Sequence, residues 1–199
     1  LTIRRAVTAR GRVELLTSSF EERETCRHAL ARAGCGLGVE VTTPTGWVAS
    51  LWELLGTGTH LASTLQRNLL IADILASWDP SDLEPLRDTP GTRFLLASMA
   101  RDFLPYVLDG ARMARLAPAS QAEDLVVRLL RRYADRLAKL GLEEPSTAAV
   151  HLARSFADEL PACASCVIVR GMQKVPAYLM DLLASVGAAG ECTVLLAPQ

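Results

Sequence analysis

Hydroxyl side chains lie at two places in the sequence where they could bind a phosphate group. Thr17, Ser18 and Ser19 stand at the end of one short apolar run, and Thr43 stands at the end of a second. Both sets precede a predicted helix, and hydroxyls beside the free amides of a helix N-terminus bind phosphate well. We therefore take these residues as candidate contacts for a phosphate group. Helix capping alone also explains them, and it is the favoured interpretation because Ser and Thr are preferred N-caps.

A stripe of cations occupies one side of the helix that is predicted to start near Ser120. Such a stripe could follow a phosphate backbone. A solvated helix face is the favoured alternative, because the chain has 21 Lys and Arg against 22 Asp and Glu and a net charge of -1. Cations near the end of a helix also suit its dipole. Arg128, Arg131 and Arg132 are the candidate DNA contacts of a stripe that also includes Arg136 and Lys139.

The remaining reactive side chains do not form a recognisable catalytic or metal-binding set. Cys163 and Cys166 make a C-x-x-C pattern, but it precedes a predicted strand and has no second pair of ligands for zinc. Burial by chance is the favoured interpretation of these cysteines. No catalytic residue, metal or cofactor is predicted from these side chains. The histidines are isolated from one another in the sequence: His28, His60 and His151.

The composition is that of an ordinary globular protein. The chain has 199 residues, of which 50% are hydrophobic and 22% charged, so it can bury a sizeable core and is not expected to be disordered. No apolar run reaches the roughly 18–20 residues that span a bilayer, and no membrane partner is predicted. The five cysteines are an odd number, which favours a reducing, cytoplasmic location over a disulfide framework.

The segment 1–12 is predicted to be a flexible basic arm. It lacks the apolar segment and the cleavage site of a secretory signal. The sequence also lacks an initiator Met, which suggests an excised or processed chain. The arginines of this arm are Arg4, Arg5, Arg10 and Arg12.

Four short apolar runs are predicted to be strands, with helices between them. Overlapping S-x-x-E signals after the first run start a helix that extends to about residue 33. After the second run, Pro44 takes the first position of a helix that carries Trp47 and Trp52 at the spacing of a buried face. Strand, helix, strand, helix with short turns is typical of a parallel sheet. The predicted strands are 13–17, 39–43, 166–169 and 192–196.

The middle of the chain, 61–141, contains no convincing strand and is predicted to be a helical insertion. Ser63 and Ser120 begin capping boxes. Between them, Thr89-Pro90-Gly91 is predicted to belong to a loop. The predicted α/β core consists of 13–60 and 142–199. In the second segment, Ser146 is predicted to cap a helix that extends to about residue 160, and 176–186 is predicted to be a second helix.

The most informative segment is VIVRGMQKVP, residues 167–176, in which an apolar strand runs into a polar turn. With the order of the elements, it resembles superfamily 1 DNA helicases of the UvrD and RecB type. The likeness is greatest to the degenerate, helicase-like N-terminal region of AddB-type subunits of helicase–nucleases. UvrD-type helicases carry D-E-x-Q-D after this strand. Here Gln173 and Pro176 match, whereas Arg170, Gly171 and Lys174 stand at the acidic positions.

The resemblance implies a site that has lost ATP hydrolysis. In the active family, the first carboxylate helps to hold Mg²⁺ and the second polarises the attacking water. Arg170 places a positive charge at the metal position, and Gly171 has no side chain to act as a base. The sequence also contains no G-x-x-x-x-G-K-[ST] phosphate loop. By the same resemblance, Thr17–Ser19 and Thr43 occupy positions of motifs that contact single-stranded DNA.

The implied fold is a three-layer, P-loop-NTPase-like α/β domain, with a parallel sheet of about four strands and a large all-helical insertion. The implied function is that of a non-catalytic pseudo-helicase fragment from a DNA repair or recombination helicase–nuclease subunit. It would contact single-stranded DNA or act as a scaffold for a partner subunit. Two alternatives stay open: a truncated NTPase or helicase that lacks its Walker A loop, and a pure protein-interaction domain.

Overall fold

The computed structural model divides the chain into two compact units, which are treated separately below. Unit 1 comprises Leu1–Thr57 and Ala149–Gln199, and unit 2 comprises Gly58–Ala148. The structure describes residues 3, 7, 11–78, 89–115, 118, 120–155, 166–189 and 191–196.

Unit 1 is built on a parallel sheet of four strands in the order β2-β1-β5-β6. The chain passes from β1 through α2 to β2, and from β5 through α10 to β6, as parallel neighbours require. After β2 the chain enters α3 and unit 2, and it returns through α8 to β5, beside β1. The strands are β1 (Val13–Thr17), β2 (Val39–Thr42), β5 (Cys166–Met172) and β6 (Glu191–Leu196).

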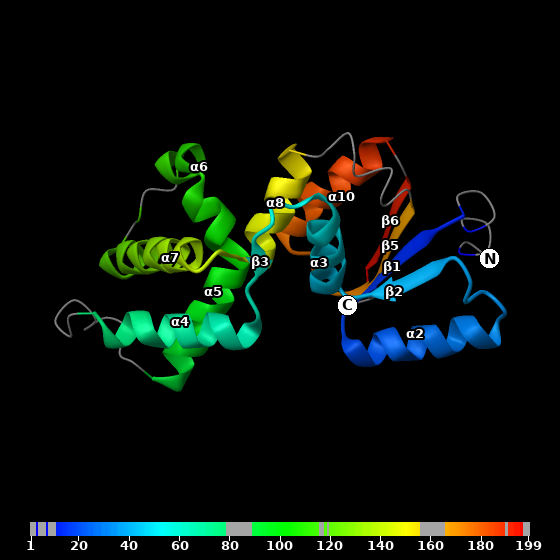
Figure 1. Ribbon diagram of the computed structural model, residues 1–199, viewed down its shortest axis with the longest axis horizontal. Coiled ribbons are helices and arrows are strands. Elements are labelled where there is room, and N and C mark those ends of the chain that lie inside the picture. Colours follow the sequence, from blue (N-terminus) through cyan, green and yellow to red (C-terminus); the bar gives the residue numbers. More distant parts are fainter. Residues whose placement is uncertain are drawn as a thin grey trace. The chain divides into compact units, whose positions relative to one another are not determined.

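Helices cover both faces of this sheet, which makes unit 1 a parallel α/β structure. Figure 1 shows α2 (Phe20–Arg32) on one face, and α3 (Pro44–Leu55) and α10 (Ala177–Ala189) on the other. All residues of β1 are buried, as expected for a central strand with two covered faces. The α2 face packs Cys26 against a cluster of strand residues: Val13, Leu15, Val41, Cys166 and Ile168.

Unit 2 is a group of helices with its own apolar core. The core is formed by buried side chains of three helices, among them Ile71, Leu104 and Leu129. A short parallel pair of strands, β3 (His60–Leu61) with β4 (Leu142–Glu143), joins the beginning of the unit to its end. The helices are α4 (Thr64–Ala76), α5 (Pro90–Leu108), α6 (Gly110–Arg115) and α7 (Gln121–Lys139), followed by α8 (Pro145–Ser155), which continues into unit 1.

The structure corrects several boundaries. Unit 2 extends beyond the predicted insertion of 61–141 and is not all-helical, because the β3–β4 pair closes it. Thr89 does not lie within a loop: it accepts a hydrogen bond from the Thr92 amide and caps α5, with Pro90 in the first turn. Helix α8 starts at Pro145, so Ser146 lies within its first turn and is not the N-cap that the sequence predicted.

The predicted flexible arm, 1–12, contacts the core where the structure describes it. Ile3 and Val7 pack against the apolar cluster under the sheet, and Arg12 forms a 2.9 Å ion pair with Glu14. Arg4, Arg5 and Arg10 lie outside the described residues.

A buried ion pair holds the helices of unit 2 to the end of that unit. The Arg67 guanidinium of α4 donates from Nε to both oxygens of Glu144, at 3.0 and 3.2 Å, and from Nη2 at 2.5 Å. The Tyr133 hydroxyl of α7 donates to the same carboxylate at 2.7 Å. Burial, together with the Glu144 charge, raises the pKa of Tyr133 well above its ordinary value. Three segments far apart in the sequence therefore meet at one carboxylate.

We expect Glu144→Gln to lower the free energy of unfolding by about 3–5 kcal/mol, because Arg67 would remain buried without a counter-charge. Asp124→Asn is the matched control, since it breaks the exposed pair between Asp124 and Arg128. That exposed pair contributes about 0–1 kcal/mol. Urea unfolding followed by circular dichroism measures both changes. Equal losses in the two variants would contradict a structural role for the buried pair.

The second buried carboxylate, Glu14, lies in β1 opposite Glu40 of β2. Burial raises the pKa of Glu14, and the Glu40 charge adds to this effect, while Arg12 opposes it. The native state therefore binds the Glu14 proton more tightly than the unfolded state does. This contribution to stability is present at low pH and is lost as the pH rises through the raised pKa.

We accordingly predict that Glu14→Gln stabilises the protein at neutral pH. The gain should shrink as the pH falls through the raised pKa of Glu14, and it should be lost below the ordinary value of about 4.5. Glu40→Gln removes the like charge but not the buried carboxylate, so it should give a smaller gain. Urea titrations at several pH values provide the comparison. A gain from Glu14→Gln that does not change with pH would rule out the protonation mechanism.

Candidate functional site

The carboxyl ends of β1, β2 and β5 meet at one edge of the unit 1 sheet, which we call the carboxyl edge. In the strand register, Thr42 is the partner of Leu16, and Arg170 is the partner of Thr17. The parallel pairing thus places Thr17, Thr42 and Arg170 at one edge of the sheet. In open parallel sheets, ligands bind outside this edge.

Thr17 is a structural residue at the carboxyl edge. Its side chain is buried, and its hydroxyl lies 3.3 Å from the carbonyl oxygens of both Ser19 and Thr42, to which it donates. It therefore ties the ends of β1 and β2 together and does not present a hydroxyl to a ligand.

Ser18 and Ser19 are exposed, but both bond within the first turn of α2. The Ser19 hydroxyl accepts from the Glu22 amide at 3.1 Å, which makes Ser19 the N-cap. Glu22 in turn accepts from the Ser18 amide at 3.0 Å and from the Ser18 hydroxyl at 2.6 Å. Glu21 and Glu22 place two carboxylates in this turn, which suits the helix dipole and repels phosphate.

Thr43 is the N-cap of α3. Its hydroxyl accepts from the Gly46 amide at 3.2 Å. The first turn of α3 carries no acidic residue, in contrast to α2. Capping therefore accounts for the hydrogen bonds of both Ser19 and Thr43.

Gly171 follows Arg170 in a bulge at the end of β5. The register between β5 and β6 shifts between Arg170 and Met172, and Gly171 has a φ of 76°, in the left-handed region that favours glycine. A Cβ atom at this position would overlap the carboxylate of Glu22. The space beside Gly171 is thus filled by a side chain of α2.

Arg170 and Gln173 are exposed at the same edge. One terminal nitrogen of Arg170 lies 3.9 Å from the Cys26 sulfur, a weak donor contact. Arg170 and Gly171, which follow Val169, have no carboxylate that could bind a metal ion. Within the described ranges, no group of three or more His, Cys, Asp or Glu side chains is placed to hold a metal.

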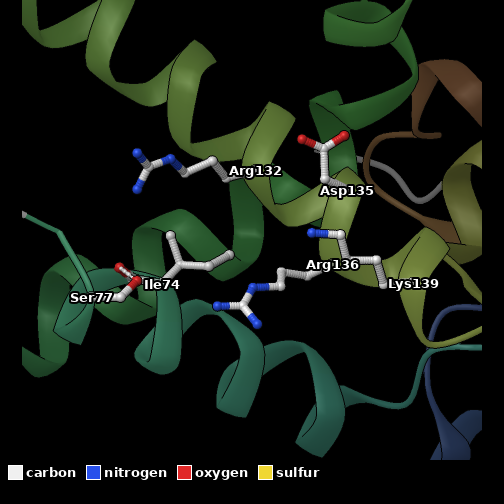
Figure 2. A pocket seen from close by; sticks show the side chains of 6 residues that line it. All are labelled: Ile74, Ser77, Arg132, Asp135, Arg136 and Lys139. Atoms are coloured by element: carbon white, nitrogen blue, oxygen red, sulfur yellow. Dashed lines mark hydrogen bonds between the residues drawn. The ribbon is translucent and has the colours of Figure 1, made fainter.

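The cation stripe lies in unit 2, where part of it lines a pocket of about 340 Å³ between α4 and α7. Figure 2 shows Arg136 and Lys139 reaching from α7 toward the side that carries Ile74 and Ser77 of α4. Of the predicted contacts, Arg132 lines the pocket, whereas Arg128 and Arg131 do not. The complete lining is Ile74, Ser77, Arg132, Asp135, Arg136 and Lys139.

Trp78 positions two of these cations. The Arg132 guanidinium lies 4.2 Å from the centre of its ring, and that of Arg128 lies 5.9 Å away. Both distances fall in the range of cation–π attraction. Arg128 also pairs with Asp124 at 3.0 Å, and Arg136 pairs with Asp73 at 3.3 Å.

The other candidates of the sequence analysis take structural places or lie outside the described part of the chain. Trp47 and Trp52 are buried, as the core interpretation predicted, and Trp52 makes an edge-on contact with His151 at 5.5 Å. His28 and His60 are exposed, and Cys166 is buried. Cys163 lies outside the described residues, so the C-x-x-C pattern stays a prediction.

The sequence was compared with protein-family models and with curated proteins. No protein-family model matches the sequence, and no curated protein matches it. Among the described residues, no helix is both long and apolar enough to cross a membrane.

The sequence did not predict that Glu22 lies beside Gly171 or that Trp78 contacts Arg132. It also did not predict that Ile74 and Ser77 line the pocket of unit 2. Only Gly171 had a usable signal, because an isolated glycine inside an apolar strand run indicates a bulge. Trp78 and Ser77 come at the end of α4, and nothing in their local spacing indicates that α7 lies against them.

We predict that Gly171→Ala lowers the free energy of unfolding more than Gly34→Ala does. Both positions have positive φ, 76° and 65°, and share a backbone cost of about 1–2 kcal/mol. Only Gly171 faces the Glu22 carboxylate, since nothing lies within 4 Å of a Cβ at Gly34. Adding Glu22→Ala to Gly171→Ala should recover the difference in a urea-unfolding double-mutant cycle. Independent, additive effects would show that Glu22 does not fill this space.

Proposed function

We propose that this chain is a non-catalytic, helicase-like module of a DNA repair or recombination protein, which contacts single-stranded DNA. Its fold would be a degenerate relative of the P-loop-NTPase-like domains of superfamily 1 helicases. The parent protein would be a helicase–nuclease subunit of the AddB type, and a partner subunit or another domain would supply the catalysis.

The observation that carries this proposal is the end of β5. A parallel α/β sheet that hydrolyses ATP needs a carboxylate there to hold Mg²⁺ and a second to polarise water. Arg170 and Gly171 stand at these positions, and the Glu22 carboxylate fills the space beside Gly171. The oxygens of Glu22 already accept two hydrogen bonds from Ser18. Glu22 is therefore a poor replacement for the missing carboxylates.

Two further features support the proposal. A separate unit is inserted between β2 and β5, in agreement with the order of elements in the resemblance. The cations of α7 supply a local positive surface, which a chain of net charge -1 needs if it is to bind a polyanion.

The protein-interaction alternative has one observation in its favour. Helix α5 exposes Phe94, Leu95 and Phe103, whose exposed fractions are 76%, 51% and 52%. Exposed apolar groups of this size suit a protein contact. Affinity for DNA that falls with salt separates the two functions, because an apolar contact does not release counterions.

The direct test is a fluorescence-anisotropy titration of the chain with a labelled, single-stranded oligonucleotide of mixed sequence at about 50 and about 200 mM salt. We expect binding that weakens steeply with salt, since released counterions drive it. A bovine serum albumin titration at the same ionic strength controls for adventitious contact by an acidic protein.

Phosphate release from Mg²⁺-ATP, with and without the oligonucleotide, provides the second readout. It should stay at the rate of the buffer blank. Turnover stimulated by DNA would contradict the non-catalytic assignment. No binding at the lower salt concentration would contradict the DNA contact and favour the protein-interaction domain.

A further inference from the structure

The cations of α7 form a regular row. Arg128, Arg132, Arg136 and Lys139 follow one another at intervals of three or four residues, so each stands one turn, about 5.4 Å, beyond the last. A linear polyanion that lies along the helix would therefore meet one positive charge in every turn. Arg131 falls outside this row, on a neighbouring part of the helix surface.

The C-terminal part of this row lines a pocket. Arg132, Arg136 and Lys139 form one wall of the pocket of about 340 Å³, while Ile74 and Ser77 of α4 form the other. Clefts lined by one sign of charge focus the field more strongly than a flat surface does. Asp135 is the one carboxylate in the lining, against three cations.

The present contacts of Arg132 and Arg136 hold these side chains in place, and they are weak enough for the cations to bind a ligand. The guanidinium of Arg132 lies 4.2 Å from the centre of the Trp78 ring, and among the described residues no carboxylate forms an ion pair with it. The pair between Arg136 and Asp73 is about half exposed on both sides, at 48% and 59%, and such pairs are weak enough to exchange for phosphate. The Ser77 hydroxyl donates to the Ile74 carbonyl at 2.9 Å at the edge of the same pocket.

We propose that this pocket is a phosphate site that holds the backbone of single-stranded nucleic acid along α7. The assignment rests on the proposed function for the identity of the polyanion, and it names the surface that does the binding. Arg132 and Arg136 would donate to phosphate oxygens, and Lys139 would supply a third charge at the end of the row. A flexible single strand can follow the row into a concave site, which a stiff duplex cannot do as easily.

The test compares Arg132→Ala and Arg136→Ala with Arg131→Ala in the anisotropy titration of the full chain. All three variants lose one positive charge from α7, but only the first two change the pocket. Each pocket variant should weaken binding about fivefold at about 0.1 M salt, and should lower the slope of log K against log salt by about 0.7. Arg131→Ala should stay within twofold of the unchanged protein. Asp135→Asn should tighten binding.

Each other outcome has a definite meaning. Equal weakening by all three arginine variants would overturn the pocket and indicate a diffuse charge effect, while the proposed function stands. No binding by the unchanged protein would overturn both the phosphate pocket and the proposed function. A labelled poly-glutamate peptide that binds as tightly, with the same dependence on Arg136, would overturn the nucleic-acid assignment in favour of an acidic protein partner. Thermal unfolding shows whether Arg132→Ala is folded, and Arg136→Ala tests the pocket without the Trp78 contact.

Discussion

The parallel pairing of β1 with β5 is the constraint on which the rest of unit 1 depends. It joins Glu14–Thr17 to Val167–Arg170, although all of unit 2 lies between these segments in the sequence. Because the strands run in the same direction, their carboxyl ends meet at one edge, together with the first turns of α2 and α3. The hydrogen bonds of Thr17 to two backbone carbonyls and the bulge at Gly171 then shape this edge. An edge of this kind is where parallel sheets bind ligands, and here the Glu22 side chain fills the space beside Gly171.

In unit 2, a buried ion pair joins segments that lie far apart in the sequence. Arg67 and Glu144 are 77 positions apart, and the buried ion pair between them fixes α4 to the residue that precedes α8. Tyr133 brings α7 to the same carboxylate. The positions of α4 and α7 then decide where the cations of α7 stand relative to Ile74 and Ser77. The buried network of Arg67, Tyr133 and Glu144 and the cation pocket thus depend on the same arrangement of α4 and α7.

Local sequence patterns predicted the elements well, because apolar periodicity and capping residues act over a few positions. The strands at 13–17 and 192–196 and the caps at Ser19, Ser63 and Ser120 are confirmed. Features that depend on contacts between distant segments could not be predicted. The β3–β4 pair is two residues long on each side, and Arg67 looks in the sequence like any cation on a helix. Thr89-Pro90-Gly91 was predicted to be a loop but begins α5, because Thr and Pro are common both in loops and at the start of helices.

The candidate site divides in the same way. The sequence placed Arg170 and Gly171 at the end of an apolar strand, and the structure confirms that position. The roles of the hydroxyl groups could not be decided, and the structure shows them in capping bonds. The cation stripe was visible as a helical spacing, but the pocket beside it needed the fold. The described residues thus form a parallel α/β unit with Arg170 and Gly171 at the end of β5, and a helical unit with a cation-lined pocket between α4 and α7.

The most direct measurement is a two-dimensional ¹H–¹⁵N NMR titration of the chain with a single-stranded oligonucleotide at low salt. The account predicts that the side-chain Nε–H signals of Arg132 and Arg136 shift, while the amides of Ser18, Ser19 and Glu22 at the carboxyl edge do not. Shifts of the carboxyl-edge amides with unchanged arginine signals would contradict it, because the polyanion would then bind at the sheet and not on α7.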